Sequence, residues 1–302
     1  MRMLGSGPMS ATSEAPAAFL NSADRPGPIT LLREGIREVA SRRRLVRYLV
    51  AAEIRKRGVN TILGNIWWIL DPLLLMAVYV VLVAIITTRH IPDYPLFLFA
   101  AILPWKWFNT SVVDATTSVV SQQRLIKQIA FPKLVLPLAA TTAGAVGFAF
   151  GLVPLGAIML LYLDRLSPLI VLVPVIAAVQ FVFTLAVAIF VAAGNVFVRD
   201  LGNVIRHLLR LWWYLSPGLY SLSLLDDVEL FKRYPIIEDA IRANPFTILF
   251  DAYRNVIYGT PDALPIPPDW LALAGLLLGS FVLLAVAIVT FKRLEPTFAK
   301  VL

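Results

Sequence analysis

The chain has 302 residues, is 59% hydrophobic with a mean hydropathy of +0.77, and carries a formal net charge of +8. Several apolar runs reach about 20 residues, the length at which a helix crosses a bilayer. The absence of cysteine excludes disulfides, thiolate metal sites and cysteine nucleophiles, and two histidines far apart in sequence argue against a metal site. We therefore expect a polytopic membrane protein whose basic residues mark cytoplasmic ends and contact anionic lipids instead of nucleic acid.

The amino-terminal region divides into two segments. Residues 1–28 are rich in Ser, Ala, Gly and Pro and lack the apolar core of a secretory signal, so we expect a disordered tail. In residues 29–57, Leu32, Ile36 and Val39 share one helical face while arginines occupy the others. This pattern predicts an amphipathic interfacial helix on an anionic membrane surface, with a soluble basic arm as the alternative.

The rest of the chain, residues 58–302, is expected to be one all-α membrane domain. Six apolar segments predict six transmembrane helices over residues 66–86, 95–118, 134–163, 167–193, 204–225 and 270–291. In the third, glycines at 144, 147 and 151 are spaced so that a neighbouring helix can pack closely. In the fifth, Pro217 and Gly218 predict a kink.

The second span carries polar residues at a regular interval. Lys106, Thr110 and Asp114 recur every four residues and so form one stripe, which in a membrane must face protein or water. The stripe predicts a pore lining or a subunit interface. A Lys106–Asp114 arrangement that satisfies itself within the bundle is the alternative.

The stretch QQRLIKQIAFPK, residues 122–133, lies between the second and third spans. Leu125, Ile126 and Ile129 make a short apolar face, Arg124 and Lys127 lie three apart on another, and a proline then stops the helix. A plain turn needs no apolar face, so the pattern favours docking to a partner's groove. Docking to lipid and simple packing of the loop stay open.

Residues 245–258, between the fifth and sixth spans, are amphipathic. Phe246, Phe250 and Tyr253 keep helical spacing, while the segment is too short and too charged to cross a bilayer alone. We expect re-entrant helices that dip from the outer face, with a surface-lying helix as the alternative.

Cations close to the span ends predict the orientation. Four basic residues precede the first span closely and a single arginine follows it, which places the amino terminus in the cytoplasm. An even number of spans then places the carboxyl terminus there too. Lys292, Arg293 and Lys300, after the last span, agree with this orientation.

Four blocks of the sequence resemble one family. Residues 122–133 resemble the cytoplasmic coupling helix of type-2 ABC exporter permeases, within a region, residues 103–138, similar to that family's signature region. Residues 52–79, 196–220 and 244–259 resemble further blocks in the same order. The resemblance is to permeases that export lipid-linked polysaccharides such as O-antigens, teichoic acids or actinobacterial cell-wall glycans.

The resemblance implies a homodimer in the bacterial inner membrane, clamped by two copies of a separate ATPase chain that binds ATP and magnesium. This chain would then hold no cofactor and would be a transporter subunit, not an enzyme. The sequence has no G-x-x-x-x-G-K-[ST] phosphate loop, which agrees with a separate ATPase. By this resemblance the residues expected to couple to the ATPase are Arg124, Leu125, Ile126, Lys127, Phe131, Arg199 and Asp200.

A polysaccharide permease also needs a path for sugars. Flat aromatic rings offer weak, tolerant contacts to pyranose faces, so we expect a substrate path along Trp105, Lys106, Trp107, Asp114, Trp212, Trp213 and Tyr214. The resemblance also places an external gate at Phe246, Phe250 and Tyr253.

Three other functions remain open from the sequence. The same fold can export a drug or a small lipid. A proton-coupled carrier would need carboxylates deep in the membrane, and Asp71 and Asp114 both lie near cytoplasmic ends of their spans. A membrane glycosyltransferase could use the same two carboxylates as acid and base, although the chain shows no paired-carboxylate motif.

Overall fold

The structure, a computed structural model, describes residues 26–58, 62–86, 91–222, 233, 235–260 and 264–302. Most of the predicted tail, residues 1–28, lies outside these ranges. The helices are α1 (Pro28–Ser41), α2 (Arg43–Gly58), α3 (Trp67–Ile86), α4 (Tyr94–Ser121), α5 (Gln123–Gln128), α6 (Val135–Met159), α7 (Val173–Phe197), α8 (Leu201–Leu215), α10 (Pro235–Arg242), α11 (Pro245–Ile257) and α12 (Trp270–Val301). Short 3-10 helices lie at Gly64–Ile66, Leu163–Arg165 and Pro168–Leu172.

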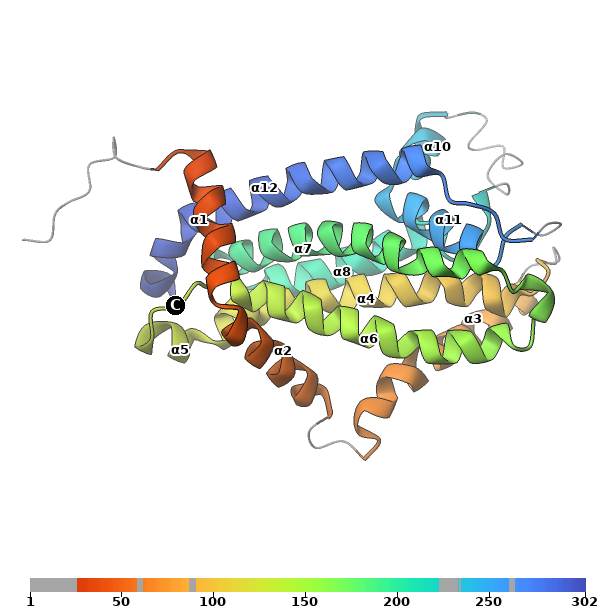
Figure 1. The fold of residues 1–302 in the computed structure, drawn as a ribbon, viewed down its shortest axis with the longest axis horizontal. Helices are drawn as coiled ribbons and strands as arrows, with labels where there is room; N and C mark the ends of the chain where they lie inside the picture. The colour runs from red at the N-terminus through yellow and green to blue at the C-terminus, as the bar shows by residue number, and fades with distance from the viewer. Residues whose placement is uncertain (1–25, 59–61, 87–90, 223–232, 234, 261–263) are drawn as a thin grey trace, which may run out of the picture.

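In the described part of the chain, five helices are long and apolar enough to cross a membrane: α3, α4, α6, α7 and α12. Four of them, α4, α6, α7 and α12, run side by side with α8 along the long axis of the molecule (Figure 1). The central helix is α4, which is buried along most of its length by α3, α6, α7, α8 and α11. The outer helix α3 leaves most of its apolar surface exposed, as expected of a helix that faces lipid or a second protein.

Small residues bring α6 close to α4, as the glycine spacing predicts. A Cβ atom on Gly144 would collide with Ser111 Oγ, and one on Gly151 would lie 2.6 Å from Leu103 Cδ2. A larger side chain at either position would therefore displace Ser111 or Leu103 of α4. The two glycines allow the helices to pack closely.

The predicted fifth span, residues 204–225, is not among the five membrane-capable helices of the described residues, so the count of six is not confirmed. α8 ends at Leu215, and Pro217 follows where a proline ring cannot continue the helix. The expected kink is therefore the end of the helix. The segment after α8 contacts the first turn of α4, where the Tyr94 hydroxyl donates a hydrogen bond to the Leu219 carbonyl at 3.0 Å.

The predicted single helix over residues 29–57 is two helices that meet at a turn at Arg42. α1 crosses α12, whereas α2 packs against α6, at the same end of the bundle (Figure 1). Of the predicted face, Leu32 and Val39 pack partly against the core, whereas Ile36 is 56% exposed. Leu31 and Gly35 are buried in addition, because a Cβ on Gly35 would lie only 2.9 Å from Ile288 of α12.

Candidate functional site

A cavity of about 510 Å³ lies between α3, α4 and α8, and we call it the α4–α8 hollow. Five of the seven residues predicted for the substrate path line it: Trp105, Lys106, Asp114, Trp213 and Tyr214. They come from two helices, α4 and α8, and α8 begins 80 residues after α4 ends. The structure therefore brings most of the predicted path together at one place.

Two stripes of four-residue spacing face this hollow. On α4 the stripe is the predicted one, Lys106, Thr110 and Asp114. On α8 it is Arg206, Arg210 and Tyr214, of which sequence reasoning singled out only the tyrosine. The same i, i+4, i+8 interval that identified the first stripe is present in the second and was the available signal.

Charges in the α4–α8 hollow are unequally satisfied. Lys106 forms an ion pair with Asp71 on α3, not with Asp114, so the self-satisfied Lys106–Asp114 alternative is wrong. Arg206 donates to the Gly202 carbonyl at 3.1 Å and to Asn203 Oδ1 at 2.7 Å, both within α8. Arg210 forms no hydrogen bond or ion pair with any residue that the structure describes. Among the described residues, the hollow thus presents one guanidinium without a partner, that of Arg210, and a second, that of Arg206, which is bonded only within its own helix.

Two tryptophans, Trp105 and Trp213, line part of the hollow. The Trp105 and Trp213 ring centroids lie 5.4 Å apart, and the Trp213 indole N–H donates to the Tyr79 hydroxyl at 3.0 Å. Both tryptophans are buried, so only part of each ring reaches the cavity. Tyr214 is different, because 54% of it is exposed.

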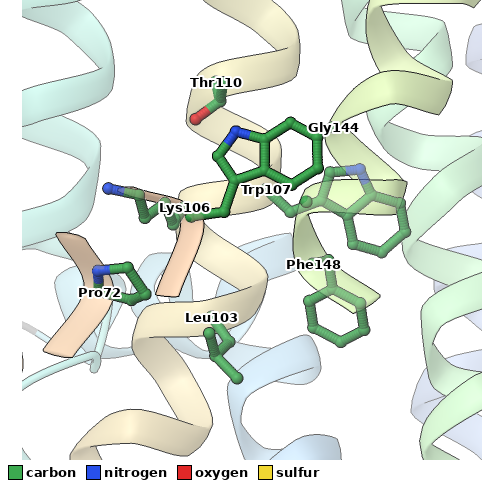
Figure 2. Close-up of a pocket in the computed structure, with 9 residues that line it drawn as sticks. Pro72, Leu103, Lys106, Trp107, Thr110, Gly144 and Phe148 are labelled. Carbon is green, nitrogen blue, oxygen red and sulfur yellow. The ribbon is translucent and has the colours of Figure 1, made fainter. Parts of the chain in front are cut away.

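Two other predicted path residues point away from the hollow. Trp107 packs toward α6 with its ring centroid 5.0 Å from that of Phe148. Trp107 borders a small cavity of about 40 Å³. Lys106 and Pro72 of α3 border the same cavity on the side away from Phe148 (Figure 2). Trp212 donates from its indole nitrogen to Asn244 Oδ1 at 3.0 Å and packs edge-on against the core. These two rings are used in packing between helices.

The three predicted gate residues lie in the hydrophobic core of the chain. Phe246, Phe250 and Tyr253, on α11, are each at most 1% exposed. Phe246 packs edge-on against Trp105 with centroids 4.7 Å apart, near the middle of α4. At the other end of α11, the Tyr258 hydroxyl donates to the Pro92 carbonyl at 2.9 Å, just before α4 begins. α11 therefore lies along the first half of α4.

Arg254 holds α11 in this position and was not anticipated from the sequence. Its guanidinium donates to the carbonyls of Pro217 and Gly218, each at 2.6 Å, and to that of Phe97 at 3.3 Å. Arg254 is buried, and the dipoles of these three carbonyls stabilise its guanidinium there.

The predicted coupling residues gather at one end of the bundle, which we call the α5 end. On α5, Arg124 and Lys127 are exposed, Leu125 is half-buried, and Ile126 is buried against the bundle. Ile129 is 56% exposed, just after the helix.

The α7–α8 turn lies beside α5 at this end. Phe131 packs partly into the same core as Ile126. Arg199 and Gln123 line a shared cavity of about 300 Å³ that the carboxyl-terminal residues also border, and Asp200 is exposed next to Arg199. The two predicted coupling segments are therefore neighbours in space.

A charged network joins three elements at the α5 end. Lys292 Nζ on α12 lies 2.9 Å from Glu38 and 3.3 Å from Glu34, both on α1, and 3.0 Å from Glu295. Glu295 also accepts the backbone N–H of Lys133 at 2.9 Å, in the segment that follows α5. The network therefore ties α1, α12 and the α5 segment together.

Comparison with known proteins gives a consistent relationship. No protein-family model matches the chain. An O-antigen export system permease protein of Myxococcus xanthus is 33% identical over 267 residues, which cover 88% of this chain and 98% of that protein. An O-antigen export system permease protein of Klebsiella pneumoniae is 25% identical over 251 residues, covering 83% and 92% of the two chains.

Proposed function

Because the chain belongs to the family of O-antigen export system permeases, which are type-2 ABC exporter permeases, we propose that it moves a lipid-linked glycan out of the cytoplasm. It is a multi-pass membrane protein and the permease subunit of a polysaccharide exporter, and such subunits are not enzymes. In our proposal two copies form the passage in the bacterial inner membrane. Two copies of a separate ATPase bind ATP and magnesium and drive the export.

We place the α5 end in the cytoplasm, with both termini. Exposed arginines gather there on α2, including Arg43, Arg44 and Arg47, as on the cytoplasmic side of membrane proteins. The sixth crossing is then α8, about 22 Å long at 1.5 Å per residue, followed by the non-helical residues 216–221. Non-helical backbone at membrane depth needs internal partners, and Arg254 supplies them at Pro217 and Gly218.

Coupling to the ATPase is assigned to the α5 end. Arg124 and Lys127 offer exposed charge and Ile129 an exposed apolar side chain for docking. Ile126 and Phe131 face the bundle and so carry a movement of α5 inward. The Glu295 bond to Lys133 extends the connection to α12 and α1.

The substrate path is assigned to the α4–α8 hollow, with α11 as a re-entrant gate toward the outer face. The observation that carries this assignment is that two polar stripes from α4 and α8 line one cavity with aromatic rings at its wall. Neither alternative that used Asp71 and Asp114 gains support, because Asp71 pairs with Lys106. No observation in the described residues favours export of a drug or small lipid.

Co-purification tests the coupling. We expect a near-equimolar ATPase to accompany the tagged chain after mild detergent extraction, and Arg124→Glu/Lys127→Glu to lower its yield at least about tenfold by reversing charge at the docking surface. The control, Arg43→Glu/Arg44→Glu, makes the same charge change on α2 and should retain the ATPase. If wild type brings down no ATPase, or if both double variants lose it equally, the proposed docking surface is wrong.

A further inference from the structure

In the described residues, two arginines of the α4–α8 hollow form no hydrogen bond or ion pair with another helix. Arg206 and Arg210 lie about 8 and 14 Å along α8 from its start at the α5 end, at 1.5 Å per residue. Arg206 bonds only within its own helix, and Arg210 bonds to nothing in the described residues. Cationic side chains at such depth mark functional pathways, because an unpaired charge inside a membrane protein is costly.

The charge balance of the hollow favours an anion. Its lining holds three cations, Lys106, Arg206 and Arg210, and one carboxylate, Asp114. Asp71 neutralises Lys106 from α3, which leaves the two arginines against Asp114. A guanidinium presents a planar fork of N–H donors that matches phosphate oxygens in pairs.

The surroundings of the arginines distinguish between anions. Tyr214, one turn beyond Arg210, is half exposed to the hollow, and Trp105 and Trp213 follow at its wall. From α3, Leu75 lines the hollow, and Leu74, Val78 and Val81 on the same helix are exposed apolar residues. Cationic, aromatic and apolar zones thus adjoin one another, and together they match a phosphate, a sugar and a hydrocarbon chain.

We propose that the α4–α8 hollow binds the phosphate or diphosphate that joins a polyprenyl chain to its saccharide, with Arg206 and Arg210 as the donors. The inference rests on the proposed function, since it names the part of the exported molecule that this site recognises. An anionic phospholipid headgroup offers the same phosphate chemistry without the isoprenoid chain. The test therefore compares the two sources.

The experiment uses the full chain with its co-purifying ATPase, in phosphatidylcholine nanodiscs. Binding of radiolabelled polyprenyl diphosphate is measured alone and in competition with phosphatidylglycerol and with uncharged polyprenol. We expect polyprenyl diphosphate to compete at least about tenfold better than either lipid, because only it has both the phosphate and the isoprenoid chain.

Variants locate the site. Arg210→Gln should raise the Kd about tenfold or more, and Arg206→Gln/Arg210→Gln further, since each removes a charge-assisted donor. Arg210→Lys keeps the charge but lacks the planar pair of N–H donors, so its Kd should lie between those of wild type and Arg210→Gln. The control is Arg293→Gln, an exposed arginine on α12 near the α5 end, which should bind like wild type. Unchanged thermal unfolding shows that the variants fold.

Two results would overturn the assignment. An unchanged Kd in the folded double variant would show that the arginines do not hold the phosphate. Equal competition by phosphatidylglycerol would make the hollow a site for anionic lipid. Either result leaves the proposed export function standing if the ATPase still co-purifies, whereas loss of the ATPase from wild type counts against that function itself.

Discussion

Replacing Lys292 by Met tests the charged network that joins α1 to α12. Lys292 is 9% exposed, and its ammonium lies within 3.3 Å of carboxylate oxygens of Glu34, Glu38 and Glu295. Methionine keeps the unbranched apolar stem that packs beside Gly35 and removes only the charge. Three carboxylates then lose the cation that they share.

The expected loss follows from the exposure of each partner. Removing one member of a buried ion pair costs about 3–5 kcal/mol. The side chains of Glu34 and Glu38 are 46% and 31% exposed and can turn toward water, so we expect about 2–3 kcal/mol. The loss should be local to α1, which is otherwise anchored by Leu31 and the contact at Gly35.

Limited trypsin digestion measures this loss at exposed Arg33 and Arg37 on α1, because cleavage requires local opening of the helix. An opening free energy lowered by about 2–3 kcal/mol raises the cleavage rate about 30- to 150-fold. Lys300→Met, at an exposed lysine outside the network, is the control and should cleave like wild type. Equal rates for wild type and Lys292→Met would refute the anchoring of α1 by this network.

Three further substitutions test other parts of the account. Arg254→Gln should lower stability by about 2–4 kcal/mol, since three carbonyls lose a charged donor; an unfolding midpoint equal to that of Arg293→Gln would contradict this. Gly144→Ala should lower the free energy of unfolding by about 1–3 kcal/mol through overpacking against α4. Gly156→Ala, where the added methyl group meets open space, is the control and should not destabilise the chain. Equal unfolding midpoints for the two variants would argue against close packing of α6 on α4. Tyr214→Ala removes a half-exposed ring from the hollow and should slow glycan export several-fold at unchanged stability; an unchanged export rate would exclude this ring from the path.

Hydropathy and length predict most of the bundle, because a membrane helix must satisfy its backbone internally and cover it with apolar side chains. Five of the six predicted spans correspond to membrane-capable helices for this reason. The fifth does not, because Pro217 ends α8 and tertiary bonds from Tyr94 and Arg254 support the chain beyond it. These partners lie more than 30 positions away in the sequence, so the local hydrophobic periodicity cannot predict the bonds.

In the candidate site, too, features set by local spacing are predictable from the sequence, and features set by distant residues are not. The stripe of Lys106 and Asp114 is visible in the sequence because its spacing is local, and it does line the α4–α8 hollow. Arg206 and Arg210 share that spacing, but near a span end their charge has an ordinary explanation as a cytoplasmic marker. The partners of Lys292 lie about 250 residues away, so only the fold identifies that network. The sequence does not separate the roles of the aromatic residues, since a ring in a core and a ring in a cavity have the same sequence pattern.

The central claim is that this chain and its ATPase together move a lipid-linked glycan through the membrane. The direct measurement uses the purified complex in liposomes, with the ATPase facing outward and a radiolabelled lipid-linked glycan in the membrane. We predict that added ATP increases the fraction of glycan protected from an external glycosidase, and that the Arg124→Glu/Lys127→Glu variant abolishes this increase. An intact complex that hydrolyses ATP without protecting any glycan would contradict the account.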